Sequence, residues 1–90
     1  MDVVRVALVD DHSIVIEGLK VILRKHPWIE IVGEARCGIT ALELVGQSMP
    51  DVIILDLNLP GLHGLEVSQK IKQKSPQTKI IAHFGAFSNM

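Results

Sequence analysis

Short apolar runs and segments with helically spaced apolar residues follow one another along the chain. This pattern predicts alternating strands and helices. Four short apolar runs are expected to form strands, at residues 3–9, 29–35, 51–55 and 79–84. Between these runs, apolar residues recur at the helical spacing of three and four positions, at residues 13–25, 40–48 and 64–74. The order β-α-β-α-β-α-β favours a parallel sheet with right-handed crossovers and helices on both faces.

Local signals mark the ends of the first two predicted helices. Ser13 is placed to cap the first helix, and Pro27 ends it because the residue before a proline disfavours helix. Thr40 and Glu43 match a capping box at the start of the second helix, which is expected to end before Met49. The face of the first helix expected to pack on the sheet carries Val15, Leu19, Ile22 and Leu23.

Two of the predicted strands end in aspartate. Asp10 and Asp11 follow the first strand, and Asp56 follows the apolar residues 52–55. In doubly wound sheets, ligands bind beyond the carboxyl ends of the strands, so these carboxylates share one crevice if the first and third strands are neighbours. Their mutual repulsion would be relieved by a divalent cation such as Mg²⁺. With a cation present, an aspartate can attack phosphorus and form an acyl phosphate.

Composition limits the other classes of function. The 90 residues form one domain with a formal net charge of −1, which gives no reason to expect affinity for nucleic acid or membrane surfaces. The single cysteine, Cys37, excludes an internal disulfide and fits a reducing compartment. No apolar run approaches the roughly 18 residues that span a bilayer, and we expect a cytoplasmic domain.

The acidic segments resemble those of a known family. Residues 6–12 (VALVDDH) and 51–66 (DVIILDLNLPGLHGLE) are similar to the receiver domain of two-component response regulators. The details around residues 10–12, 17–19 and 64–66 resemble the branch whose receivers precede a LuxR/NarL-type helix-turn-helix domain. The resemblance implies a flavodoxin-like (CheY-like) α/β fold with strand order 2-1-3-4-5, truncated here to 2-1-3-4 because the fifth strand is missing.

The resemblance also implies a function in phosphorelay signal transduction. A sensor histidine kinase would transfer a phosphoryl group to this domain, which would be an acceptor and not an enzyme. DNA binding by the transcriptional regulator would reside in a domain outside this segment. The implied site consists of Asp56 as the phosphorylated residue, Asp11, Asp56 and the backbone carbonyl of Asn58 as Mg²⁺ ligands, Asp10 as a ligand through water, and Pro60 and Gly64 as residues that shape the loop.

The chain departs from the family pattern at two positions. Receivers place Ser or Thr at the end of the fourth strand, where this sequence has Phe84, and a later Lys has no counterpart because no lysine follows Lys79. Each missing partner is a charge-assisted hydrogen bond worth roughly 1.5–3 kcal/mol, so weak phosphorylation is expected. We expect an incomplete receiver domain at 1–84 with a tail at 85–90. The uncovered apolar strand 79–84 predicts a homodimer or swapped oligomer.

Other interpretations stay open beside this one. A degenerate receiver could act only as an interaction or dimerisation module, without phosphorylation. A phosphatase would want a second acid two residues after Asp56, where Asn58 cannot serve. The four histidines lack a zinc-ligand spacing. His12 adjoins the acidic pair and could have a raised pKa or fold over the metal site, but a surface position at the start of a loop is favoured.

Overall fold

The computed structural model describes residues 2–60 and 64–83. Strands and helices alternate along this part of the chain. In chain order they are β1 (Val4–Val9), α1 (Ser13–Leu23), β2 (Ile29–Ala35), α2 (Gly38–Ser48), β3 (Val52–Asp56), α3 (Gly64–Lys74) and β4 (Lys79–His83). Each predicted element is present, and β2 and α3 have the predicted bounds.

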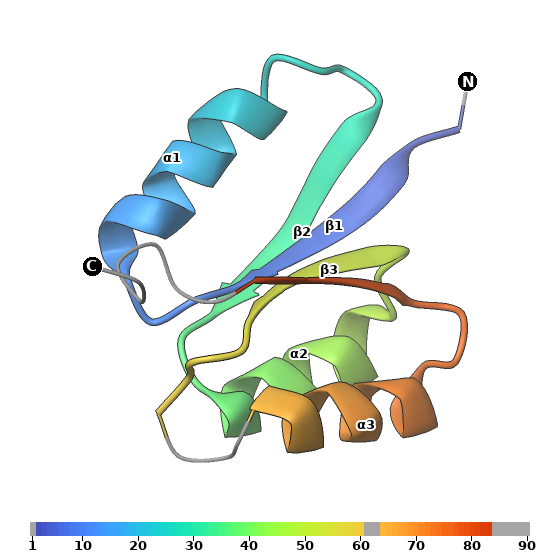
Figure 1. The fold of residues 1–90 in the computed structure, drawn as a ribbon. Helices are drawn as coiled ribbons and strands as arrows, with labels where there is room; N and C mark the ends of the chain where they lie inside the picture. The colour runs from blue at the N-terminus through green and yellow to red at the C-terminus, as the bar shows by residue number, and fades with distance from the viewer. Residues whose placement is uncertain (1, 61–63, 84–90) are drawn as a thin grey trace.

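The four strands form one parallel sheet in the order β2-β1-β3-β4. Helix α1 lies on one face of the sheet, and α2 and α3 lie side by side on the other (Figure 1). The predicted fold class, a doubly wound parallel sheet with strand order 2-1-3-4, is confirmed. Because β1 and β3 are neighbours at the point where the strand order reverses, the residues that follow these two strands meet at one edge of the sheet.

Alternate residues of the central strands face two apolar layers. One layer packs the sheet against α2 and α3, and its members include Val9, Leu55, Val45 and Ile71. The other packs it against α1, through Leu8 and Ile16 with Ile54 at its margin. β-Branched and aliphatic side chains on both faces of a strand are typical of parallel sheets covered by helices. Successive residues of β1 and β3 therefore pack into opposite helix layers.

Both predicted helix caps are wrong. His12 holds the N-cap position of α1, while Ser13 is already helical and its hydroxyl accepts a hydrogen bond from Arg36. Cys37 holds the N-cap position of α2, and the hydroxyl of Thr40 donates to the carbonyl of Cys37 at 3.2 Å. In both cases the hydroxyl that was predicted to cap a helix forms a hydrogen bond with another residue instead.

The packed face of α1 also differs from the expectation in part. Ile16 is fully buried and Leu19 and Leu23 pack beside it, whereas Ile22 is 56% exposed. Helix α1 lies over β2 and β1 and leaves the same face of β3 and β4 more open (Figure 1). Ile81 of β4 is accordingly 56% exposed. None of the helices in the described residues has the length and apolar character needed to cross a membrane.

Candidate functional site

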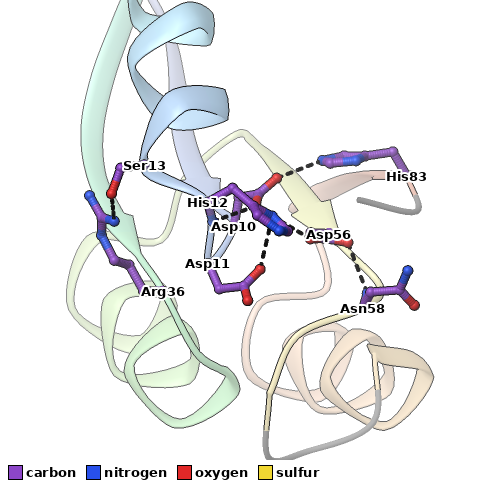
Figure 2. Close-up of polar contacts among 8 residues, drawn as sticks. All are labelled: Asp10, Asp11, His12, Ser13, Arg36, Asp56, Asn58 and His83. Atoms are coloured by element: carbon purple, nitrogen blue, oxygen red, sulfur yellow. Dashed lines mark hydrogen bonds and ion pairs between the residues drawn. The ribbon is translucent and has the colours of Figure 1, made fainter. Parts of the chain in front are cut away.

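Acidic side chains converge at the carboxyl ends of β1 and β3. The strands pair as far as Val9 and Leu55, and Asp10 and Asp56 come next on each. Asp10, Asp11, His12 and Asp56 each offer one ligand atom, and these atoms all lie within 4.8 Å of one another. Figure 2 shows the four side chains pointing toward a common centre. The sequence therefore predicted correctly that the three carboxylates share one crevice.

Asp10 and Asp56 are held in the same way although they lie on different strands. In each, Oδ1 accepts a hydrogen bond from the backbone N–H of the residue two positions later. The N–H of His12 donates to Asp10 at 2.9 Å, and the N–H of Asn58 donates to Asp56 at 2.8 Å. Both side chains are buried, with 1% and 0% exposed. The Oδ2 atom of each has no hydrogen-bond partner among the described residues. A buried carboxylate oxygen that accepts no hydrogen bond is costly, so a further positive or hydrogen-bonding group beside these two atoms would be favourable.

The ring of His12 lies among the carboxylates, which favours the alternative position beside the acidic pair over a surface position at the start of a loop. Its Nδ1 is 2.9 Å from Asp10 Oδ1, 3.1 Å from Asp11 Oδ1 and 4.0 Å from Asp56 Oδ2. The hydrogen bond to Asp10 raises the pKa of His12 above its ordinary value of 6.5, and the nearby negative charges add to this effect. The surrounding carboxylates thus favour the protonated form of the ring. The sequence signal was its place directly after two aspartates.

His83 approaches the site from β4. Its Nε2 is 3.7 Å from Asp10 Oδ2. In the β3–β4 register, His83 is the residue paired with Asp56. The side chain of Asn58 is directed away from the carboxylates, and its contact to Asp56 is made by the backbone N–H (Figure 2). Backbone atoms, and not the amide, therefore connect this residue to the site.

Gly64 and Pro60 flank the loop after β3. Gly64 is buried at the start of α3, and a Cβ atom there would lie 2.3 Å from the backbone oxygen of Leu57. Only glycine fits at that distance, so Gly64 lets α3 approach the backbone beside Asp56. Pro60 is exposed and is the last described residue before the gap at 61–63. Phe84, at the position where a hydroxyl was expected, lies outside the described residues.

The donor atoms fit a hard divalent cation. Oxygen ligands suit Mg²⁺, which usually takes one or two carboxylates and keeps several waters. Asp10 and Asp56 each present a buried oxygen that accepts no hydrogen bond among the described residues, and the carboxylate of Asp11 completes the acidic set. A cation there would offset the repulsion between these groups. The residues that are present can therefore hold Mg²⁺.

The site lies at the sheet edge where doubly wound folds bind ligands, and the sequence around it matches one family model. The model described as "Response regulator receiver domain" matches residues 6–88. The chain belongs to the response regulator receiver domain family. The resemblance seen in the acidic segments of this receiver domain is thereby confirmed.

Characterised relatives place the receiver domain in the LuxR/NarL-type branch. The nitrate/nitrite response regulator protein NarL of Escherichia coli strain K12 is 41% identical over 76 residues, which cover 84% of this chain and 35% of that protein. The response regulator UvrY of the same strain is 40% identical over 78 residues, which cover 87% of this chain and 36% of that protein. The chain thus spans about a third of the length of these relatives.

Solved structures show the same fold. A LuxR-family two-component response regulator from Aurantimonas sp. SI85-9A1 has a TM-score of 0.83 and 34% identity, covering 93% of this chain and 62% of that one. The response regulator domain of Thermotoga maritima CheB has a TM-score of 0.83 and 36% identity, covering 89% of this chain and 59% of that one. The receiver domain described here therefore has the CheY-like architecture that the sequence predicted.

Proposed function

We propose that this receiver domain accepts a phosphoryl group on Asp56 from a sensor histidine kinase, as part of a DNA-binding transcriptional regulator. One observation carries the proposal. Asp56 is fully buried at the sheet edge, one of its oxygens is fixed by the N–H of Asn58, and the other has no hydrogen-bond partner among the described residues. A carboxylate oxygen held in place without a hydrogen-bond donor keeps its lone pairs available for attack.

The chemistry follows from the two oxygens of Asp56. Its Oδ1 stays on the N–H of Asn58, which orients the carboxylate. Its Oδ2 forms the new bond to phosphorus, while the bond from phosphorus to the donor's imidazole nitrogen breaks and the electron pair leaves with that nitrogen. The product is an acyl phosphate on Asp56. The protein acts here as the acceptor, so we assign it no enzymatic activity of its own.

Asp11, Asp56 and the backbone carbonyl of Asn58 would hold Mg²⁺, with Asp10 contacting it through water. When bound, Mg²⁺ neutralises charge on the incoming phosphoryl group, which three bare carboxylates would repel. His12 occupies the same crevice, so its ring and the cation would contact the same carboxylate oxygens. Gly64 and Pro60 would set the path of the loop that follows β3.

Phosphorylation is tested with acetyl phosphate and Mg²⁺, followed by intact-protein mass spectrometry. We expect the mass to increase by one phosphoryl group, and Asp56→Asn to abolish the increase. Asp51→Asn is the matched control, because Asp51 immediately precedes β3, at the opposite end of the strand, where its Oδ2 accepts the N–H of Arg5 at 2.9 Å. A chain that gains no phosphoryl group, or gains it equally in Asp56→Asn, contradicts the proposal and favours a receiver that serves only as an interaction module.

Strand β4 supports the further proposal of self-association. No fifth strand covers it in the described part of the chain, and Ile81 and Ala82 are exposed. An apolar strand with an open edge presents backbone groups that can pair with another chain. We infer a homodimer, or an oligomer that exchanges elements, through strand 79–84; light scattering after size exclusion distinguishes it from a monomer.

A further inference from the structure

His83 reaches the acidic site from β4, a strand that supplies none of its carboxylates. Its backbone is fixed beside the site, because the N–H of Leu57 donates to the carbonyl of His83 at 2.7 Å and His83 pairs with Asp56 in the β3–β4 register. Residues paired across neighbouring strands carry their side chains on the same face of a sheet. The side chain of His83 accordingly extends from β4 toward Asp10 (Figure 2).

The ring of His83 ends just short of hydrogen-bond distance from the buried carboxylates. Its Nε2 is 3.7 Å from Asp10 Oδ2, beyond the roughly 2.7–3.2 Å of an N–H···O hydrogen bond. The Oδ2 atoms of Asp10 and Asp56 accept no hydrogen bond among the described residues. The side chain of His83 is 31% exposed, whereas the two carboxylates are buried, so the ring lies between them and solvent. A new acceptor that enters the crevice therefore meets this ring.

A phosphoryl group on Asp56 is an acceptor of this kind. It would be joined to Oδ2, the oxygen that Asn58 does not hold, and it would bring three strong acceptor oxygens with negative charge. Because Asp56 and His83 are paired on strands about 4.8 Å apart, these oxygens come within reach of Nε2. The other nearby ring, that of His12, is already engaged, since its Nδ1 is 2.9 Å from Asp10 Oδ1.

We infer that the Nε2–H of His83 donates a hydrogen bond to the phosphoryl group on Asp56, which makes His83 a phosphoryl-binding residue of this receiver domain. The inference rests on the function proposed above and adds one residue to its site. A neutral ring with its hydrogen on Nε2 and a protonated ring both donate from this atom, so the contact needs no change of protonation. Hydrogen bonds of this kind are often long before the ligand binds and shorten in the complex.

A purely structural contact between His83 and Asp10 predicts different results. If the ring served only to hold Asp10, its removal would alter the stability of the chain and the binding of Mg²⁺ before any anion is added. A phosphoryl-binding ring instead leaves both of these properties unchanged, because its present distance to Asp10 exceeds a hydrogen bond. Its removal then weakens only the binding of the phosphoryl group or of an analogue.

The test is a titration of the Mg²⁺-loaded chain with beryllofluoride, an analogue of the phosphoryl group, followed by fluorine NMR. We expect His83→Leu to bind the anion roughly tenfold to a hundredfold more weakly, because a hydrogen bond to a charged acceptor is lost. His83→Gln should retain most of the affinity, because its amide still offers an N–H. His26→Leu is the matched control and should bind like the unmodified chain. The ring of His26 packs against Trp28 at 4.7 Å, before β2 begins and at the opposite end of the sheet.

Two further measurements separate anion binding from structure. The urea midpoint and the Mg²⁺ affinity without beryllofluoride should be the same in His83→Leu as in the unmodified chain. The unmodified chain also gives a signal that needs no variant: in a two-bond ¹H–¹⁵N spectrum of the histidine rings, beryllofluoride should shift the Nε2 resonance of His83 and leave that of His26 in place. Equal anion affinity in His83→Leu, a loss that only follows weaker Mg²⁺ binding, an equal loss in His83→Gln, or an unmoved His83 resonance overturns the inference.

Failure of this inference differs from failure of the proposed function. If the unmodified chain does not bind beryllofluoride, or if Asp56→Asn binds it equally well, the proposed function and the role of His83 fail together. If the unmodified chain binds the anion through Asp56 and His83→Leu binds it with the same affinity, phosphoryl acceptance stands and the role of His83 is refuted.

Discussion

Replacing Gly64 with alanine tests whether close approach of α3 to the β3 loop holds the acidic site in place. An added Cβ would lie 2.3 Å from the backbone oxygen of Leu57 and 2.5 Å from its Cα, closer than real Cβ atoms come to other heavy atoms. Backbone atoms cannot rotate away, so either α3 or the segment at Leu57 must shift. Overpacking of this kind costs about 1–3 kcal/mol of unfolding free energy.

Gly18 is the matched control for Gly64→Ala. It lies within α1, it is exposed, and an added Cβ would meet nothing within 4 Å. Gly18→Ala should therefore stabilise the protein by roughly 0.5–1 kcal/mol, because glycine loses more backbone entropy in a helix than alanine does. The same chemical change is thus expected to have opposite signs at the two positions.

Urea unfolding followed by far-UV circular dichroism measures both variants. In thermal unfolding by the same signal, each kcal/mol corresponds to roughly 4–8 °C in Tm for a domain of this size, so Gly64→Ala should melt clearly below the unmodified chain and Gly18→Ala above it. Leu57 lies between Asp56 and Asn58, so Gly64→Ala should also weaken Mg²⁺ binding, measured by calorimetry. An unfolding midpoint for Gly64→Ala at or above that of the unmodified chain would refute the reasoning.

Three other changes probe single contacts. Asp56→Asn should raise the unfolding free energy by about 1–3 kcal/mol in the absence of Mg²⁺, because it removes a buried charge, and chemical denaturation in a metal chelator checks this. Thr78→Val should cost a similar 1–3 kcal/mol by the same assay, because the buried Thr78 hydroxyl donates to the carbonyl of Pro50 at 2.6 Å and that acceptor would lose its partner. Thr40→Val should shift iodoacetamide labelling of Cys37 to higher pH, because the Thr40 hydroxyl lies 3.3 Å from Cys37 Sγ, where it can turn from the Cys37 carbonyl to the thiolate and so lowers the pKa of the thiol. The thiolate is the reacting form, so an unchanged pH profile would show that Thr40 does not stabilise it.

The sequence predicted most of the fold because burial repeats along the chain with the period of each element. The run at residues 52–55 is typical of a covered strand, and Val67 and Ile71, four positions apart, indicate one buried face of helix α3. The predicted cap at Thr40 was wrong because α2 begins earlier, at Gly38, and the cap at Ser13 was wrong because its hydroxyl contacts a residue from elsewhere in the fold. That residue is Arg36, which lies 23 residues away and which no local pattern could identify.

The sequence by itself determined the residue types and the strand ends of the site, whereas the tertiary structure decided their charges and partners. Asp10 and Asp56 are fixed by position, since each directly follows an apolar run. That Asp56 Oδ2 lies 4.0 Å from His12 Nδ1, and that Asp10 and Asp56 each bury an oxygen that accepts no hydrogen bond within the described chain, follow only when β1 and β3 become neighbours. Periodic burial is a local property that the sequence encodes directly, but Coulomb energies and hydrogen bonds depend on distances between residues that only the folded sheet sets.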